Sequence, residues 1–276
     1  MSRAYKVVLA IGLAASLAAC TSSRFYTPNT VNLPTMSQKG EGALSGATFF
    51  GSNSGWEAQA SYSPAQHVGL MVNYFSLNYK GSIAGTSGGF FPFPPPPQTN
   101  FEGRMRFGEA GLGLYRHAGK NREYLLSLFG AAGQGHAHNL YIEPDVPLKE
   151  ATWTFWRYSL QPGVRLQHRR LSFGASFRFS YVQYTTGRID ARIPRLELDR
   201  VEMLEAQSPM MFWEVLWTVG YHFRPITVSL NTTGVALGKK SLNDLNLASN
   251  HVSLMATLNL HELKKEKQSR GKRKKK

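Results

Sequence analysis

Six charged side chains stand out in this sequence because each lies on the polar side of a segment whose other side is apolar. They are Glu57, Glu109, Arg157, Arg165, Arg178 and Glu214. Three carboxylates and three guanidiniums can neutralise one another, and an unpaired charge buried away from water is very costly. If these polar sides meet inside a closed structure, we expect a salt-bridge network that closes its interior. The alternative is a gated path or a small-ligand site that uses the same charges.

Two histidines, His136 and His138, are separated by one residue, so on a strand they share a face. Imidazoles at this spacing can hold a metal ion, but no third ligand is evident, which makes them weak metal candidates. The sequence predicts no cofactor and no catalytic residue, because it contains no phosphate-binding glycine loop and no local triad motif. A hydrolase site at the rim of the fold, acting on lipid or peptide through His136, is the third and weakest functional alternative.

The clearest structural pattern is a hairpin in the middle of the chain. Every second residue from Trp156 to Leu166 is apolar, the turn Gln167–Arg170 is polar, and the alternation resumes from Leu171 to Tyr181. Side chains on a strand alternate between two faces, so this pattern predicts a β-hairpin with one apolar and one polar face. The pattern suits a membrane, because a spanning strand needs about 9–11 residues of such alternation, with aromatic residues near its ends.

Similar segments occur along most of the chain. Besides the hairpin, the predicted strands are Ala43–Gly51, Trp56–Ser63, His67–Tyr79, Phe101–Arg116, Arg122–His136, Met211–Phe223, Ile226–Val235 and Asn246–His261. Five connections are expected at one end, and four of them are long: Gly81–Asn100, Asn139–Glu150, Thr186–Pro209 and Ala236–Leu245. The fifth, Ser52–Gly55, is short, and all four connections at the other end are short turns. Outer-membrane barrels show this asymmetry, with long outer loops and short periplasmic turns. The sequence therefore predicts an all-β fold, an antiparallel transmembrane up-and-down β-barrel of about ten strands over residues 43–262, with eight or twelve strands as alternatives.

The N-terminus is typical of a secretory signal. A short basic region precedes an apolar core, Val7–Leu17, that is too short for a transmembrane helix. The core leads into Leu17-Ala18-Ala19-Cys20, which resembles the lipobox of bacterial lipoproteins. The resemblance implies that residues 1–19 are a cleaved signal peptide and that Cys20, the only cysteine, carries the lipid, including a palmitate. An ordinary signal peptide with a chance cysteine is the alternative.

The segment after Cys20 is expected to be a lipidated tether. Residues 20–42 contain Pro28 and Pro34, which favour an extended chain in the periplasm. No acidic cluster follows Cys20, and this favours an anchor in the periplasmic leaflet of the outer membrane.

The excess positive charge is concentrated at the C-terminus. The formal net charge is +15, and nine Lys/Arg against one Glu between Lys264 and Lys276 account for +8 of it. A nucleic-acid partner would depend on this tail alone and is not expected. Residues 263–276 are expected to form a disordered tail, and its functional alternative is attraction to anionic lipid or to a periplasmic partner. The other expected partners are outer-membrane lipids, and the sequence indicates no oligomeric state.

Four features together resemble uncharacterised outer-membrane barrel lipoproteins of Bacteroidota. They are the lipobox, the Tyr26-Thr27-Pro28-Asn29 tether, the Lys39-Gly40-Glu41 approach and the Gln59–Pro64 strand end. The resemblance covers most of the chain and implies the outer membrane of a Gram-negative bacterium, with both termini periplasmic, but no activity. We therefore expect a non-catalytic barrel lipoprotein with a structural or surface-contact role through its outer loops. A small porin-like or ligand-translocating barrel is the alternative.

Overall fold

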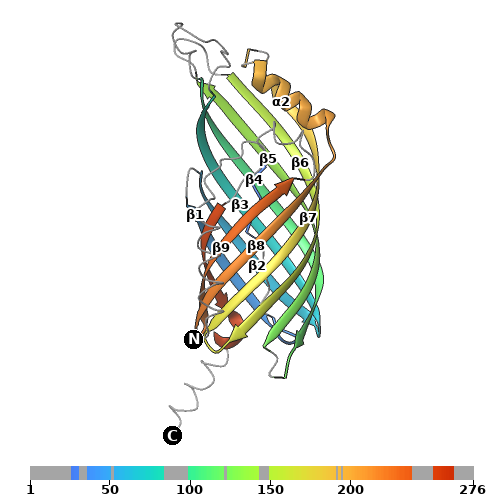
Figure 1. Ribbon diagram of the computed structural model, residues 1–276, viewed down its shortest axis with the longest axis vertical. Helices are drawn as coiled ribbons and strands as arrows, with labels where there is room; N and C mark the ends of the chain where they lie inside the picture. The colour runs from blue at the N-terminus through green and yellow to red at the C-terminus, as the bar shows by residue number, and fades with distance from the viewer. Residues whose placement is uncertain are drawn as a thin grey trace.

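The described residues form a closed antiparallel β-barrel (Figure 1). The computed structural model describes residues 26–30, 36–50, 53–83, 99–120, 123–142, 149–190, 192–193, 195–237 and 251–263. Each strand pairs with its neighbours in sequence, and β1 pairs with β10 to close the ring. The structure therefore confirms the predicted fold class and the predicted number of strands.

The strands begin and end within a few residues of the predicted positions in most cases. They are β1 (Gly42–Phe50), β2 (Asn53–Ala65), β3 (Val68–Ile83), β4 (Thr99–Ala118), β5 (Tyr124–Ile142), β6 (Lys149–His168), β7 (Leu171–Ile189), β8 (Met210–Phe223), β9 (Ile226–Leu237) and β10 (His251–Asn259). The main difference is at the ends joined by long connections, where β3 to β7 continue into segments predicted as loops. The reason is that these segments still pair with each other, as Asn100 does with Ile142, and so satisfy their backbone polar groups.

An apolar belt covers the outside of the barrel. On β6 and β8, the outward side chains of Trp156, Tyr158, Trp213 and Trp217 are each about half exposed. Leu112 on β4 is 65% exposed. Apolar exposure on this scale, repeated on all sides of a closed barrel, fits a surface that contacts lipid rather than water.

The barrel wall is uneven in height. Strands β3 to β7 have 16–20 residues, whereas β1, β2, β8, β9 and β10 have 9–14. About 9–11 tilted residues cross the apolar part of a bilayer, so β3 to β7 are long enough to extend beyond it. They extend at the end opposite the short turns, which we call the outer end, and Figure 1 shows this taller wall below α2. The opposite end is called the short-turn end.

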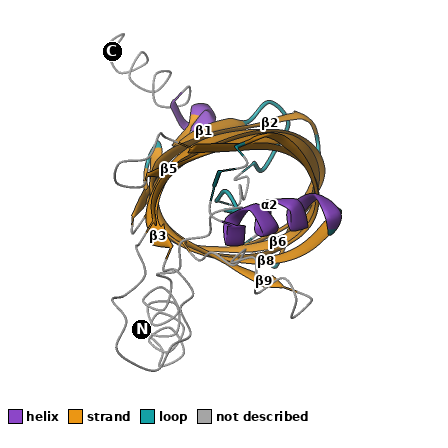
Figure 2. Cartoon of the chain, turned by 90° about the horizontal axis from the view of Figure 1, so that it is seen from above, coloured by secondary structure: helices purple, strands orange, loops and turns teal. Residues whose placement is uncertain are grey.

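The connection predicted between residues 186 and 209 contains a helix, α2 (Arg195–Ala206). Its sequence is rich in Leu, Glu, Met and Ala, which favour helix. Val201 and Leu204 are fully buried, and Leu198 packs beside them, so spacings of three residues define one apolar face. Seen from above, α2 lies over the outer mouth of the barrel (Figure 2).

The turn before α2 is held by Asp190 and Arg192. The Arg192 guanidinium donates to both carboxylate oxygens of Asp190, and the Arg192 amide donates to one of them. These hydrogen bonds lower the pKa of Asp190 to about 2. The backbone amide of Asp190 also donates to the carbonyl of Glu150 at 3.0 Å, which ties the turn to β6.

Several expectations concern residues outside the described ranges. They are the signal peptide, the lipid at Cys20, residues 84–98 of the connection predicted at Gly81–Asn100 and the basic tail beyond Leu263. No helix in the described ranges has the length and hydropathy needed to cross a bilayer.

Candidate functional site in the barrel lumen

Two buried ion pairs lie at mid-height in the lumen. Arg157 on β6 donates from Nη2 to Oε2 of Glu109 on β4 at 2.6 Å. Arg178 on β7 donates from Nε to Oε2 of Glu214 on β8 at 2.7 Å, and its Nη2 contacts the same oxygen. All four side chains are at most 1% exposed, so each charge depends on its partner.

Gly133 on β5 makes the first of these pairs possible. It lies between the two strands of the pair, because it is opposite both Glu109 on β4 and Arg157 on β6. A Cβ atom at this position would lie 2.5 Å from the carbonyl oxygen of Gly108 and 2.6 Å from the Cβ of Glu109. The absence of a side chain therefore lets the guanidinium cross β5 and reach the carboxylate.

The N-terminal segment Tyr26–Thr30 runs through the same layer. The Asn29 side-chain oxygen accepts hydrogen bonds from Arg157 at 2.6 Å and from Arg178 at 2.8 Å. Arg178 also donates to the Asn29 carbonyl at 2.9 Å, and the Asn29 amide nitrogen donates to Glu109 at 3.0 Å. One residue of the segment thus joins both ion pairs.

The neighbours of Asn29 fasten the segment on both sides. The Tyr26 hydroxyl donates to Glu214 at 2.5 Å and accepts from Arg157 at 3.1 Å. The Thr30 amide donates to Glu57 at 2.9 Å, and the Thr30 hydroxyl lies 3.0 Å from that of Ser253 on β10. The view along the barrel shows loop segments inside the ring of strands (Figure 2).

This position differs from the expectation of a tether outside the barrel for residues 20–42. Tyr26, Asn29 and Thr30 are completely buried. The physical reason is that two arginines and three glutamates project into this layer, and their remaining hydrogen-bonding groups need partners that the strands alone do not supply. We therefore call Tyr26–Thr30 the plug segment.

Glu57 and Arg165 are placed differently from the other four charged residues of the predicted network. Glu57 on β2 is buried in the central layer, where Thr30 and Gln59 donate to it. Arg165 is near the short-turn end of β6, eight residues from Arg157, and donates to Ser172 at 3.0 Å. The structure thus brings together Glu57, Glu109, Arg157, Arg178 and Glu214 and leaves Arg165 elsewhere.

Above the plug segment, the lumen is filled by aromatic side chains. The ring of Tyr26 stacks on Phe212 with a centroid distance of 4.4 Å, and Phe107 stacks on Phe155 at 5.6 Å. Phe155 also contacts Tyr184, and the apolar face of α2 covers the cluster at the outer end. Two successive layers, one charged and one aromatic, therefore fill the lumen from mid-height to the outer end.

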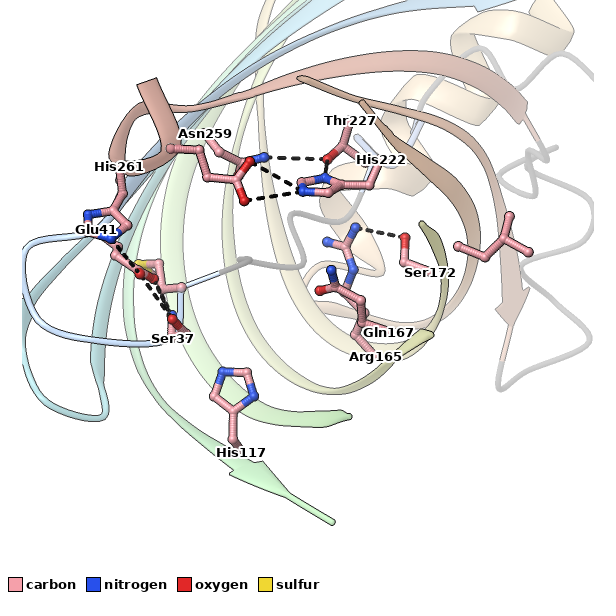
Figure 3. Close-up of a pocket in the computed structure, with 14 residues that line it drawn as sticks. Ser37, Glu41, His117, Arg165, Gln167, Ser172, His222, Thr227, Asn259 and His261 are labelled. Carbon is pink, nitrogen blue, oxygen red and sulfur yellow. Dashed lines mark hydrogen bonds and ion pairs between the residues drawn. The ribbon is translucent and has the colours of Figure 1, made fainter. Parts of the chain in front are cut away.

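A cavity of about 220 Å³ lies at the short-turn end. Figure 3 shows His117, Arg165 and His222 around it. Its acidic side chains are already engaged, since Glu41 accepts from Ser37 and Glu262 lies 3.3 Å from His222. Most of the side chains that line the cavity are polar.

The two histidines considered as metal ligands lie on the outside of the barrel wall. His136 is exposed, and His138 lies 3.3 Å from Glu150. Within the described ranges, no three His, Cys, Asp or Glu side chains are grouped so that they could hold a metal ion.

Sequence reasoning missed the contribution of Tyr26, Asn29 and Thr30. A strand pattern shows which side chains face inward, but a five-residue extended segment without alternation carries no such signal. A composition cue was present, because an aromatic and several polar residues without charge suit a buried hydrogen-bonding segment better than an exposed tether.

No protein-family model matches the sequence, and no curated protein matches it. Among solved structures, the chain is similar to the outer membrane protease OmpT from Escherichia coli, with 8% identity, 80% of this chain and 94% of that chain covered, and a TM-score of 0.43. It is also similar to a major outer membrane protein from Thermus thermophilus, with 10% identity, coverages of 79% and 98%, and a TM-score of 0.36. The NanC porin gives 10% identity, coverages of 79% and 98%, and a TM-score of 0.29.

Proposed function

We propose that this chain is a self-plugged, non-conducting β-barrel of the bacterial outer membrane with a structural or surface-contact role at its outer end. The observation that carries this proposal is the plug segment, which hydrogen-bonds to both ion pairs of the lumen. The aromatic layer and α2 fill the lumen above it. A continuous water path would have to break both layers.

Three features support the outer membrane as its location. The strand number is even, the outward surface is apolar, and the three longest connections, β3–β4, β7–β8 and β9–β10, all lie at the same end. By the rule for bacterial barrels, the short turns and both termini are then periplasmic.

We further propose that Cys20 carries a lipid, as in the Bacteroidota barrel lipoproteins that the sequence resembles. Cys20 lies six positions before Tyr26, so an extended chain limits their separation to roughly 20 Å. Lipidation would thus tie the plug segment to a membrane leaflet. Mass spectrometry of the mature protein tests this: a diacyl or triacyl Cys20 that is absent in Cys20→Ala supports it, and an unmodified N-terminus contradicts it.

The basic tail is proposed to bind anionic headgroups of the periplasmic leaflet. Each Lys or Arg near such a surface contributes on the order of 1 kcal/mol, and salt screens this attraction. Vesicle binding at low and high salt, with and without residues 264–276, tests the proposal. Unchanged binding without the tail would contradict it.

Conductance in planar bilayers tests whether the barrel is closed. The wild-type barrel is expected to show no stable open channel. A variant with Asn29→Gly and Phe155→Gly, which weakens both layers, serves as the positive control and is expected to leak. A stable open conductance of the wild-type protein would contradict the proposal.

The second candidate is a ligand-translocating barrel in which the plug segment moves aside. The polar cavity at the short-turn end favours it, because it gives a small molecule a place next to Arg165. This candidate predicts that Arg165→Ala changes uptake of a small polar solute into proteoliposomes, whereas the closed barrel predicts no uptake with either arginine or alanine.

A further inference from the structure

Four basic side chains form a compact group on the outer face of the wall, on neighbouring strands β4 and β5. Arg106 is opposite His136, and Arg104 is opposite His138. All four face away from the lumen, and Arg104, Arg106 and His136 are exposed. We call these four residues the outer basic cluster.

The cluster lies directly above the apolar belt. The next outward-facing pair toward the short-turn end is Gly108 on β4 and Gln134 on β5. Gly108 is opposite Tyr74 on β3, and Gln134 is opposite Trp156 on β6. Tyr74 is 38% exposed and Trp156 is 45% exposed. Exposed Tyr and Trp at the edge of an apolar belt mark the boundary between acyl chains and headgroups. The outer basic cluster is therefore at headgroup height.

Nearby acids do not neutralise the two arginines of the cluster. Glu102 pairs with Lys80 at 2.6 Å, and Glu150 lies 3.3 Å from both Arg188 and His138. Arg104 donates to the uncharged side chain of Asn78 at 3.1 Å. Within the described part of the chain, Arg106 and His136 make no ion pair and no side-chain hydrogen bond.

We propose that the outer basic cluster binds the phosphate group of an outer-leaflet glycolipid. Two guanidiniums on one strand face, two residues apart, present several N–H donors toward the same place, and guanidinium is well suited to phosphate oxygens. His136 adds a further donor beside Arg106. Below the cluster, the outward residues Ala110 and Ala132 are small, which leaves room for acyl chains against the wall. This inference rests on the proposed orientation, with the short turns in the periplasm.

The test uses the full-length barrel in detergent and measures binding by native mass spectrometry. The probes are a glycolipid of the lipid A class with its phosphates and the same glycolipid after their enzymatic removal. The double variant R104Q/R106Q keeps the size and polarity of the side chains. Arg116→Gln is the matched control, because Arg116 is exposed on the same strand at the short-turn end. Heat-modifiable gel mobility verifies that every variant is folded.

We expect the double variant to lose affinity for the phosphorylated glycolipid by roughly tenfold or more, since several charge-assisted hydrogen bonds are removed. Arg116→Gln is expected to bind like the wild type, and the dephosphorylated glycolipid is expected to bind the wild type as weakly as the phosphorylated one binds the double variant. Equal binding by the wild type and the double variant, or no effect of phosphate removal, would overturn the proposal. Displacement by an equimolar amount of inorganic phosphate would overturn its assignment to a lipid.

The orientation is checked separately, in whole cells, with Thr152→Cys in a chain that carries Cys20→Ser. Thr152 lies beside His138 on the outward face of β6. Labelling by a membrane-impermeant maleimide is expected. Absence of labelling would overturn the proposed orientation in the membrane. The binding experiment in detergent does not depend on this orientation and tests only whether the outer basic cluster binds the glycolipid phosphate.

Discussion

The two layers that fill the lumen close it in different ways. In the central layer each charged group has particular partners, as Arg178 has Glu214 and Asn29. In the outer layer Phe155 contacts Phe107, Tyr184 and Tyr26 through ring faces and edges, and a phenyl ring forms no side-chain hydrogen bond that would require one particular partner. The central layer therefore specifies which segment lies in the lumen, whereas the outer layer fills space.

Tyr26 belongs to both layers. Its hydroxyl is bonded to Glu214, and its ring is stacked on Phe212. The plug segment thus couples the charged layer to the aromatic layer. Three changes separate the two layers, and a fourth tests the turn that leads to α2; their expected effects decrease in that order.

The largest effect is expected for Arg178→Met. This change leaves Glu214 as a buried carboxylate without its arginine, which costs about 4 kcal/mol of unfolding free energy. Adding Glu214→Leu should restore much of the loss, because a pair of apolar side chains needs no compensation. Urea unfolding of the refolded barrel measures both variants. A single variant as stable as the wild type would show that the pair does not hold this layer.

Phe155→Ala removes a ring from the aromatic layer and is expected to cost about 3 kcal/mol through lost contacts and a cavity. Phe155→Leu should cost about 1 kcal/mol, since an apolar side chain of similar size can repack. The same unfolding measurement compares them. If the leucine variant were as unstable as the alanine variant, the outer layer would depend on ring geometry rather than on filled volume.

Asn29→Ala removes the acceptor shared by Arg157 and Arg178 and is expected to cost about 2 kcal/mol, since hydrogen bonds to charged groups are stronger than neutral ones. Asn29→Asp is the informative comparison, because it keeps the side-chain oxygen that accepts from both arginines but replaces the donor to Glu109 with a second carboxylate oxygen. Protease resistance of the N-terminal segment in the folded barrel should fall in the alanine variant. Equal resistance would contradict the role of Asn29 as the central link.

The smallest effect concerns the turn before α2 and its pH dependence. The pKa of Asp190 is lowered from 3.8 to about 2, so its stabilising contribution is present above pH 4 and is lost as the pH falls toward 2. Pepsin cleavage between β7 and α2 should therefore increase between pH 3.5 and about pH 2 in the wild type. Asp190→Asn should already be cleaved at the higher pH. Identical pH profiles for the two proteins would contradict this.

The sequence was sufficient for the ten strands and for the direction of their side chains, because alternation has a period of two residues. It did not give the height of a residue in the lumen, which depends on how the strands are staggered. Arg157 and Arg165 share a face, yet eight residues on a strand correspond to roughly 26 Å, so they cannot join one cluster. The eight-residue spacing can be read from the sequence, and it places Arg165 outside the cluster that contains Arg157.

The plug segment and α2 were harder to predict. Tyr26 and Glu214 are 188 positions apart, and a contact of this kind leaves no local pattern. The helix does have a local sequence pattern, the three-residue spacing of Leu198, Val201 and Leu204. However, this segment lies between two strong strand patterns, and a loop is predicted there.

The central claim, that residues 26–30 lie in the lumen, is tested most directly by a disulfide. The hydroxyl oxygens of Thr30 and Ser253 are 3.0 Å apart, so cysteines at both positions are expected to bridge in the oxidising periplasm of cells that carry Cys20→Ser. Thr257 faces the same side of β10 four residues away, or roughly 13 Å, so Thr30→Cys with Thr257→Cys should not bridge. The account predicts a 2 Da mass loss that is reversed by reductant in the first pair only. No bridge in the first pair, or equal bridging in both, would contradict it.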